Sequence, residues 1–320
     1  MTTFVLVHGA WHGGWCWKKL TPLLQAAKHQ VFTPTLTGLG ERAHLLTPEI
    51  DLHTHIKDIA LVLEYEDLQH VVLVGHSYGG MVLAGVAEAA GTRVEQLVFL
   101  DAFLPENGKA LTDYAPMPPM RDDGWRVPMP GTIRDFGVSD ESNIAWGEPR
   151  LGDQPYRTFT QSVQLSAPMS ESLPKTFILL SKDTPWFVEA AERAQRQGFR
   201  YYELLSAGHD AMISQPHALS QILPNLHTGK EIPIGPPKKG PAHGIWIRSG
   251  NNYVLTFESF TFDDKGINTG KIRAHLTIKM DGPDHFTATH TTDLIDLAGK
   301  VTKKVLYGAS DGTRMKVEMP

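Results

Sequence analysis

The sequence is poor in cysteine: its 320 residues include one, Cys16. A single thiol cannot form an intramolecular disulfide, and this composition suits a reducing compartment, so we expect a cytoplasmic protein. Because Cys16 lies between Trp15 and Trp17, we interpret it as a buried structural thiol.

Long hydrophobic runs and stripes of one charge are also missing. The first apolar run, residues 3–7, is only as long as a strand and is followed by glycines, so the sequence predicts neither a signal peptide nor a membrane span. The net charge is -5, without a concentrated Lys/Arg stripe, which disfavours nucleic-acid binding. A hydrophobic content of 41% is ample for a large core, and the length allows one or two domains.

Cofactor signatures are absent as well. The sequence has no glycine-rich phosphate loop, dinucleotide fingerprint or Cys/His cluster, so we expect no cofactor. His44, His53 and His55 are too scattered around a helix start to form a credible metal site, and we expect no bound metal. The chemistry should therefore use the side chains of the chain itself.

Strands and helices alternate through most of the first 228 residues. Predicted strands cover 3–7, 31–34, 71–74, 97–100, 175–180 and 200–205, and predicted helices cover 18–27, 54–66 and 216–225. This order predicts an α/β fold, a doubly wound and mostly parallel sheet covered on both faces, for a domain at 1–228.

The alternation stops between about 103 and 173, where proline, methionine and aromatic residues gather. An excursion of this length inside a compact domain is usually functional, and we interpret it as a cap over the active site. Methionine and aromatic side chains would give the cap an adaptable apolar pocket.

A second change in pattern separates the C-terminal part of the chain. The proline-rich stretch 229–241 predicts a stiff, extended linker. Residues 242–320 then contain short β-branched and aromatic runs between turn sequences, which predicts a smaller antiparallel sheet or barrel of five to seven strands. The runs lie at 253–257, 272–280, 286–294, 301–307 and 314–318. This all-β domain has no recognisable catalytic motif; we favour a packing or assembly module, including a homodimer interface, over a ligand-binding one.

The segment Gly75-His76-Ser77-Tyr78-Gly79 follows an apolar strand and precedes an apolar helix. A catalytic serine needs an exposed hydroxyl, a neighbouring base and donors for the oxyanion. A sharp turn from strand to helix supplies the exposure, and side chains at positions 75 and 79 would collide with a neighbouring strand or helix. Ser77 is therefore the predicted nucleophile.

The remaining catalytic groups should follow in the order acid, then histidine, each just beyond a strand. Asp183 and His209 occupy such loops, and the carboxyl ends of parallel strands bring distant loops together. We predict His209 as the base and Asp183 as the acid. Asp101, which ends the strand after the elbow helix, is the alternative acid.

The glycine-rich segment His8–Gly14 follows the first strand and predicts the oxyanion hole. We assign its donors to the backbone amides of Ala10 and Tyr78. His8 and His76 flank these turns and could touch the substrate, but we favour hydrogen bonds to the backbone that fix the loops. His12 has the same interpretation.

Together, the segments 4–17, 75–81 and 208–212 with Asp183 resemble one α/β-hydrolase family. It contains plant methylesterases, hydroxynitrile lyases and bacterial pyrethroid-type carboxylesterases, and the likeness covers about residues 1–227. The resemblance implies an esterase triad of Ser77, Asp183 and His209. Members that cleave cyanohydrins place a lysine directly after the catalytic histidine, where this sequence has Asp210. Because a carboxylate would oppose an anionic leaving group, hydrolysis is favoured.

The predicted function is hydrolysis of small hydrophobic carboxylic esters, aryl or alkyl, through an acyl-enzyme intermediate. Two alternatives stay open. One is a carbon–carbon lyase that resembles hydroxynitrile lyases, and the other is a non-enzymatic small-molecule receptor on the same fold.

Overall fold

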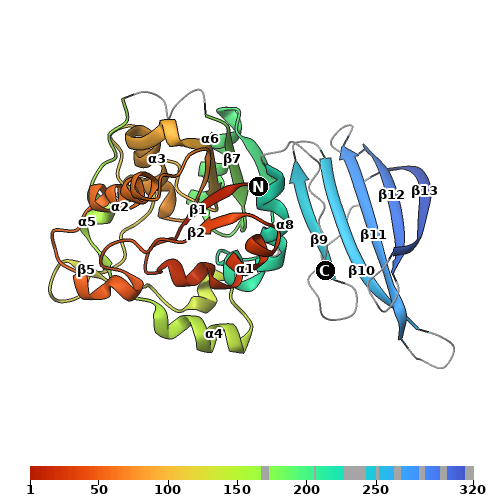
Figure 1. Cartoon of the computed structure of the whole chain (residues 1–320), viewed down its shortest axis with the longest axis horizontal. Coiled ribbons are helices and arrows are strands. Elements are labelled where there is room, and N and C mark those ends of the chain that lie inside the picture. The colour runs from red at the N-terminus through yellow and green to blue at the C-terminus, as the bar shows by residue number, and fades with distance from the viewer. Residues whose placement is uncertain are drawn as a thin grey trace.

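The structure, a computed structural model, describes residues 1–166, 173–204 and 207–226 in full, and five C-terminal strands by their backbone (Figure 1). The predicted linker at 229–241 and the predicted strand at 314–318 lie outside the described residues.

Six parallel strands form the central sheet, in the order β2-β1-β3-β4-β7-β8. Their bounds are β1 Thr3–Val7, β2 Gln30–Phe32, β3 Val71–His76, β4 Val94–Leu100, β7 Lys175–Leu179 and β8 Arg200–Glu203. The chain moves from β1 to β2 on one side, then returns to β3 and continues in the opposite direction. This reversal places a topological switch point between β1 and β3, where sheets of this type bind ligands. The prediction of a doubly wound parallel sheet is confirmed.

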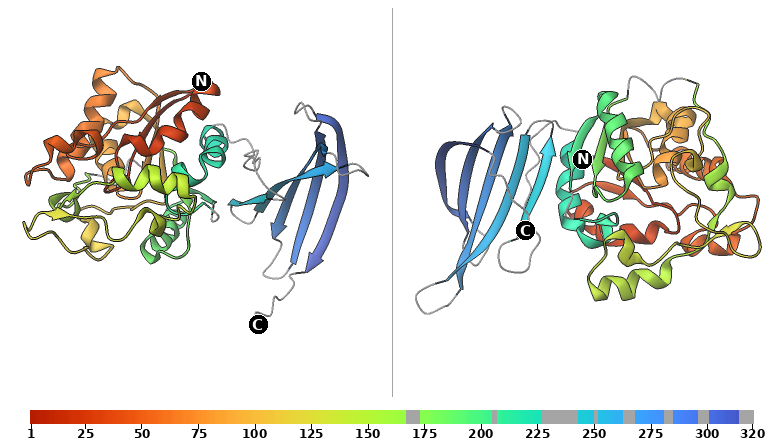
Figure 2. Two further views of the ribbon diagram at one scale, coloured as in Figure 1. Left: turned by 90° about the horizontal axis from the view of Figure 1, so that it is seen from below. Right: turned by 180° about the vertical axis from the view of Figure 1, so that it is seen from behind.

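Helices cover both faces of the sheet (Figures 1 and 2). They are α1 Thr21–Ala26, α2 Leu52–Tyr65, α3 Gly79–Ala90, α6 Pro185–Arg196, α7 Ala211–Ser214 and α8 Pro216–Leu226. Alternate residues of each strand point to opposite faces: Val5 packs in the core beneath α2 and α3, whereas Phe4 packs with α1 and α8. Both faces are buried, so the strands read as continuous apolar runs.

The local sequence explains how α2 begins and how closely it packs on α3. Asp51 caps α2 by accepting a hydrogen bond from the Thr54 amide at 2.9 Å. Ile56 and Ile59 face the core, and a Cβ on Gly85 of α3 would overlap the Ile56 side chain. Glycine at position 85 thus permits the close helix contact that supports β3 from one side.

Between β4 and β7 the chain leaves the sheet and forms short elements. These are η4 Leu111–Asp113, β5 Arg126–Val127, η5 Ile133–Phe136, α4 Glu141–Gly147, η6 Glu148–Arg150, β6 Gln154–Pro155 and α5 Arg157–Thr160. β5 pairs with β6 in antiparallel fashion. The other short helices of the chain are η1 Gly14–Lys19, η2 Gly40–Leu45 and η3 Gly91–Arg93. The insertion supplies much of the cavity wall described below.

The C-terminal strands form a second sheet, drawn in blue in Figure 1. They are β9 His243–Ser249, β10 Asn252–Phe262, β11 Asn268–Met280, β12 His285–Ile295 and β13 Val301–Thr313. Each pairs antiparallel with its neighbour in sequence, so this sheet is an open meander with β9 and β13 at its edges. In the described part of the chain, no helix has the length and apolar character needed to cross a membrane.

Candidate active site

The turn from β3 to α3 presents Ser77 to a cavity. Ser77 has a left-handed backbone conformation, with φ of 54°, which is unusual for a non-glycine residue. A Cβ on Gly75 would lie 2.7 Å from the carbonyl oxygen of Gly79, and one on Gly79 would lie 2.9 Å from that of Val7. The two glycines therefore avoid collisions with the following helix and with β1, as the sequence predicts for a nucleophile elbow.

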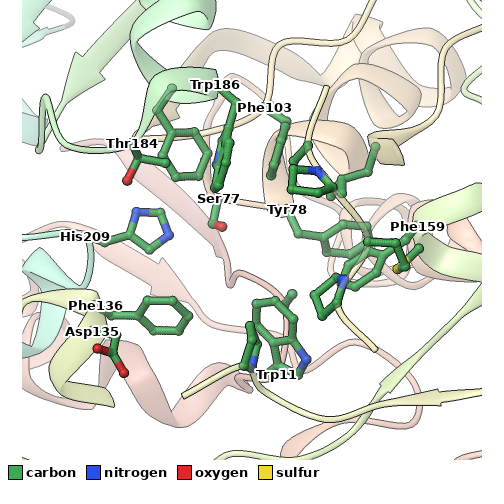
Figure 3. A pocket seen from close by; sticks show the side chains of 18 residues that line it. Trp11, Ser77, Tyr78, Phe103, Asp135, Phe136, Phe159, Thr184, Trp186 and His209 are labelled. Carbon is green, nitrogen blue, oxygen red and sulfur yellow. The ribbon is translucent and has the colours of Figure 1, made fainter. Parts of the chain in front are cut away.

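His209 follows β8 and faces Ser77 (Figure 3). Its ring stacks on Phe187, with centroids 4.8 Å apart, and contacts the edge of Phe136 at 5.3 Å. Figure 3 shows Ser77 beside the imidazole of His209 at the cavity, which both residues line. The structure thus brings together at one cavity the side chains predicted as base and nucleophile.

The carboxylate bonded to His209 is that of Asp101, and the prediction of Asp183 in this place is wrong. Nδ1 of His209 donates to Oδ2 of Asp101 at 2.7 Å, and Asp101 is fully buried. Its other oxygen accepts from the backbone amide of Leu180 at 2.9 Å. Asp183 lies on the predicted loop, but its side chain is exposed and accepts a hydrogen bond from Ser181.

The backbone explains why Asp101 reaches the histidine and Asp183 does not. Asp101 directly follows β4 and adopts a left-handed conformation, with φ of 45°, which turns its side chain across the end of β7. The Leu180 amide at that end fixes the carboxylate. Asp183 lies three residues beyond Leu180, in the exposed turn before α6. Hydrogen bonds to β7 therefore fix Asp101 at the end of its strand, whereas Asp183 bonds to Ser181 within its own turn.

Ala10 and Tyr78, the predicted oxyanion donors, both line the cavity beside Ser77. Ala10 lies in the loop after β1, and Tyr78 directly follows the nucleophile at the start of α3. The Tyr78 side chain is buried, and its hydroxyl donates to Nδ1 of His55 at 2.9 Å. That contact anchors the residue that carries the second amide.

The cavity has a volume of about 410 Å³ and is mainly apolar. Aromatic and proline residues together form most of its wall, and Ser77 and His209 lie on one side of it (Figure 3). The aromatic and proline residues are Trp11, Tyr78, Phe103, Pro116, Pro118, Pro130, Phe136, Phe159, Trp186 and Phe187. Asp135 is the one formally charged carboxylate among the lining residues. A pocket of this kind favours an uncharged, apolar ligand of modest size.

Asp210, which directly follows His209, does not line the cavity. It is fully buried and accepts a hydrogen bond from Nε2 of His12 at 3.0 Å. The sequence argument that this carboxylate would repel an anionic leaving group is therefore wrong, because the carboxylate faces a histidine behind the site. Sequence reasoning missed this pair, whose members are separated by 198 residues.

The other histidines near the site bond to the backbone. Nδ1 of His8 donates to the Gly9 carbonyl at 2.8 Å, and Nε2 of His76 donates to the His209 carbonyl at 2.9 Å. Burial lowers the pKa of His8 to about 3 and that of His76 well below its usual value. Both rings therefore serve as neutral donors that hold loops of the site.

The described residues contain no group of three or more His, Cys, Asp or Glu side chains arranged to hold a metal ion. Cys16 is buried, as its position between tryptophans predicts. The polar side chains that line the cavity include the Ser77 hydroxyl and the His209 imidazole, beside Thr184 and Asp135.

Comparison with known protein families identifies one that matches most of the chain. Residues 4–222 match the model of the alpha/beta hydrolase family. The chain belongs to the alpha/beta hydrolase family.

The chain is also similar to three individual proteins. A carbendazim hydrolyzing esterase from a Nocardioides species (strain SG-4G) is 36% identical over 245 residues, which is 71% of this chain and 100% of the relative. The crystal structure of the methylesterase MES16 from Arabidopsis is 26% identical, with a TM-score of 0.60, and covers 72% of this chain and 100% of its own. A pyrethroid hydrolase structure from Sphingobium faniae shares the fold, at 22% identity and a TM-score of 0.56 over 71% of this chain and 97% of its own.

These comparisons confirm the family that the motifs resemble. The sequence-based prediction of enzyme class is confirmed with it: the chain is a carboxylic ester hydrolase.

Proposed function

We propose that the chain hydrolyses small, uncharged aromatic esters through a triad of Ser77, His209 and Asp101. The observation that carries this proposal is the 2.7 Å bond between His209 and the buried Asp101, on a histidine that faces Ser77 at an apolar cavity. The bond places the proton of His209 on Nδ1 and leaves Nε2 free to act as a base.

The reaction begins when Ser77 Oγ attacks the ester carbonyl and Nε2 of His209 takes its proton. The Ala10 and Tyr78 amides stabilise the oxyanion, and Asp101 stabilises the imidazolium. The imidazolium then protonates the leaving alcohol, which departs and leaves an acyl-serine. His209 next activates a water molecule that releases the acid and restores the hydroxyl.

The cavity supports the choice of substrate class. Its rings would cover both faces of a flat aromatic group, and the volume of about 410 Å³ suits a compact ester. The Nocardioides relative is named for carbendazim, a small planar aromatic compound. The match covers 100% of that relative and 71% of the present chain. Carbendazim therefore belongs in the first substrate panel, beside aryl acetates and aryl butyrates.

The test compares wild-type protein with Ser77→Ala, and with Ser139→Ala as a control that changes an exposed serine of the insertion. We expect the wild type and the control to hydrolyse the same esters. Ser77→Ala should lower kcat by at least about 10⁴-fold, because the nucleophile is lost while binding is retained. A fluorophosphonate should label the wild type and leave Ser77→Ala unlabelled.

Near-normal hydrolysis by Ser77→Ala would overturn the proposal. Cleavage of mandelonitrile faster than hydrolysis of a short aryl ester would favour the lyase alternative. Tight binding of aromatic esters without turnover would favour a receptor.

A further inference from the structure

The Ala10 amide, a proposed oxyanion donor, belongs to a peptide that is held from its other side. The Gly9 carbonyl accepts a hydrogen bond from Nδ1 of His8 at 2.8 Å, and Nε2 of His8 accepts from the Leu36 amide at 3.1 Å. The Gly9 carbonyl and the Ala10 N–H are part of one planar peptide and point in opposite directions. Fixing the carbonyl therefore fixes the direction of the donor.

The next carbonyl in the loop is held in a similar way by His12. Nδ1 of His12 donates to the Ala10 carbonyl at 2.7 Å, while Nε2 bonds to Oδ2 of Asp210 at 3.0 Å. Both partners are acceptors, so both ring nitrogens of His12 carry protons and the ring is an imidazolium. Burial opposes this charge, but the Asp210 carboxylate outweighs it and raises the pKa of His12.

The loop needs such support because its backbone is strained. Trp11 has a φ of 64°, a left-handed conformation that is rare for a bulky residue. Its amide donates to Oε1 of Gln154 at 3.1 Å, and its indole donates to the Val127 carbonyl at 3.0 Å. The peptide between Ala10 and Trp11 is thus held on both sides, by Gln154 at its N–H and by His12 at its carbonyl.

The same histidine connects two loops that the sheet leaves apart. Ala10 follows β1, and His209 follows β8, and these strands are not neighbours in the order β2-β1-β3-β4-β7-β8. Asp210 directly follows His209, and its amide donates to the Phe136 carbonyl at 2.9 Å. The bond from His12 to Asp210 therefore joins the loop with the oxyanion donor to the loop with the base.

We propose that His12 is a positioning residue for the oxyanion hole, which uses its bonds to Ala10 and Asp210 to fix this hole against the loop that carries His209. The inference rests on the proposed function, because it assigns His12 a part in that reaction. The hole binds an oxyanion that exists only in the transition state and the tetrahedral intermediates. Loss of the bond to Ala10 should therefore lower kcat and leave KM nearly unchanged.

Two substitutions separate the two bonds of His12. The amide of Gln resembles Nε2 in reach, so His12→Gln can still donate to Asp210 but offers no donor at the place of Nδ1. We expect kcat to fall by about 10-fold to 100-fold, less than for complete loss of an oxyanion donor. The matched control is His53→Asn, which changes an exposed histidine of α2 and should leave kcat unchanged.

A second pair of variants removes the buried charge, which guards against loss of the fold. Asn at position 12 resembles the Nδ1 side of histidine, so His12→Asn with Asp210→Asn keeps a donor for Ala10. His12→Ala with Asp210→Asn has no such donor. We expect the Ala-containing double variant to be slower than the Asn-containing one by about 10-fold or more, with similar KM.

Phenyl trifluoromethyl ketone reports on the hole directly. Ser77 Oγ adds to its carbonyl carbon, the carbonyl π bond opens to an oxyanion, and the serine proton passes to Nε2 of His209. The inhibition constant should rise in His12→Gln by the same factor by which kcat/KM falls. A merely structural role for His12 would not link these two factors while KM stays constant.

The outcomes are distinct for the two proposals. Wild-type protein that neither hydrolyses esters nor reacts with a fluorophosphonate would refute the proposed function. An active wild type, together with a His12→Gln variant whose kcat and inhibition constant lie within about twofold of normal, would refute the role of His12. Equal kcat in the two double variants would refute it as well.

Discussion

Acid should destabilise the hydrolase domain well above the pH at which carboxylates titrate. His8, His55 and His76 are at most 1% exposed. Burial lowers the pKa of His8 to about 3, that of His55 to about 4, and that of His76 well below its usual value. In the unfolded chain, histidine titrates near pH 6.5, so below that pH the unfolded state binds protons that the native state does not.

The size of the effect follows from the pKa differences. At pH 5, about 1.5 units below the unfolded value, His8 and His55 each lower the free energy of unfolding by about 2 kcal/mol. Together these two histidines cost about 4 kcal/mol, a large share of the roughly 5 to 15 kcal/mol typical of a domain, and His76 acts in the same direction. His12 acts in the opposite sense: its raised pKa contributes stability that is present below pH 6.5 and lost as the pH rises through its folded value. One such group offsets only part of the loss.

Urea unfolding followed by tryptophan fluorescence at pH 8, 7, 6 and 5 measures this dependence. We expect the free energy of unfolding to be lower at pH 5 than at pH 7 by several kcal/mol, with unfolding linked to the uptake of about two to three protons. His55→Gln should reduce the uptake by about one proton, because it removes a neutral buried imidazole. A free energy of unfolding that stays constant from pH 7 to pH 5 would refute the reasoning.

Two further predictions concern the backbone and the cavity. A Cβ on Gly208, where φ is 69°, would lie 2.7 Å from the Gly137 Cα. Gly208→Ala should therefore lower the free energy of unfolding by about 1 to 3 kcal/mol and slow turnover by shifting His209. An unchanged melting temperature and kcat would contradict this prediction. Phe159 is 1% exposed and packs edge-on against Tyr78 at 5.8 Å, so Phe159→Ala should cost about 3 to 5 kcal/mol and shift preference toward bulkier esters. A panel of esters with increasing acyl length measures the shift. An unchanged preference would contradict the role of Phe159 as a wall that limits the size of the substrate.

The parts of the site that depend on short-range sequence could be predicted. The elbow at Ser77 requires glycine on both sides because neighbouring backbone leaves no room for a Cβ, and that requirement is visible in the sequence. The position of His209 is predictable because it follows a strand of regular apolar pattern. Both predictions rest on elements whose positions the parallel sheet determines.

The choice of acid could not be predicted, because two strand-end loops each carry a carboxylate. The choice depends on the left-handed backbone of Asp101 and on the Leu180 amide that orients its side chain. The pairing of His12 with Asp210 depends likewise on side-chain directions across the fold. A homodimer formed through the C-terminal sheet and a cytoplasmic location stay predictions.

Kinetic comparison of Asp101→Asn with Asp183→Asn tests the proposed triad most directly, because each change removes one charge at nearly constant volume. We predict that Asp101→Asn lowers kcat by about 10³-fold to 10⁴-fold, since the amide can hold His209 in the wrong tautomer, and that Asp183→Asn stays within about twofold of wild type. The reverse order, with Asp183→Asn the slower enzyme, would contradict the account.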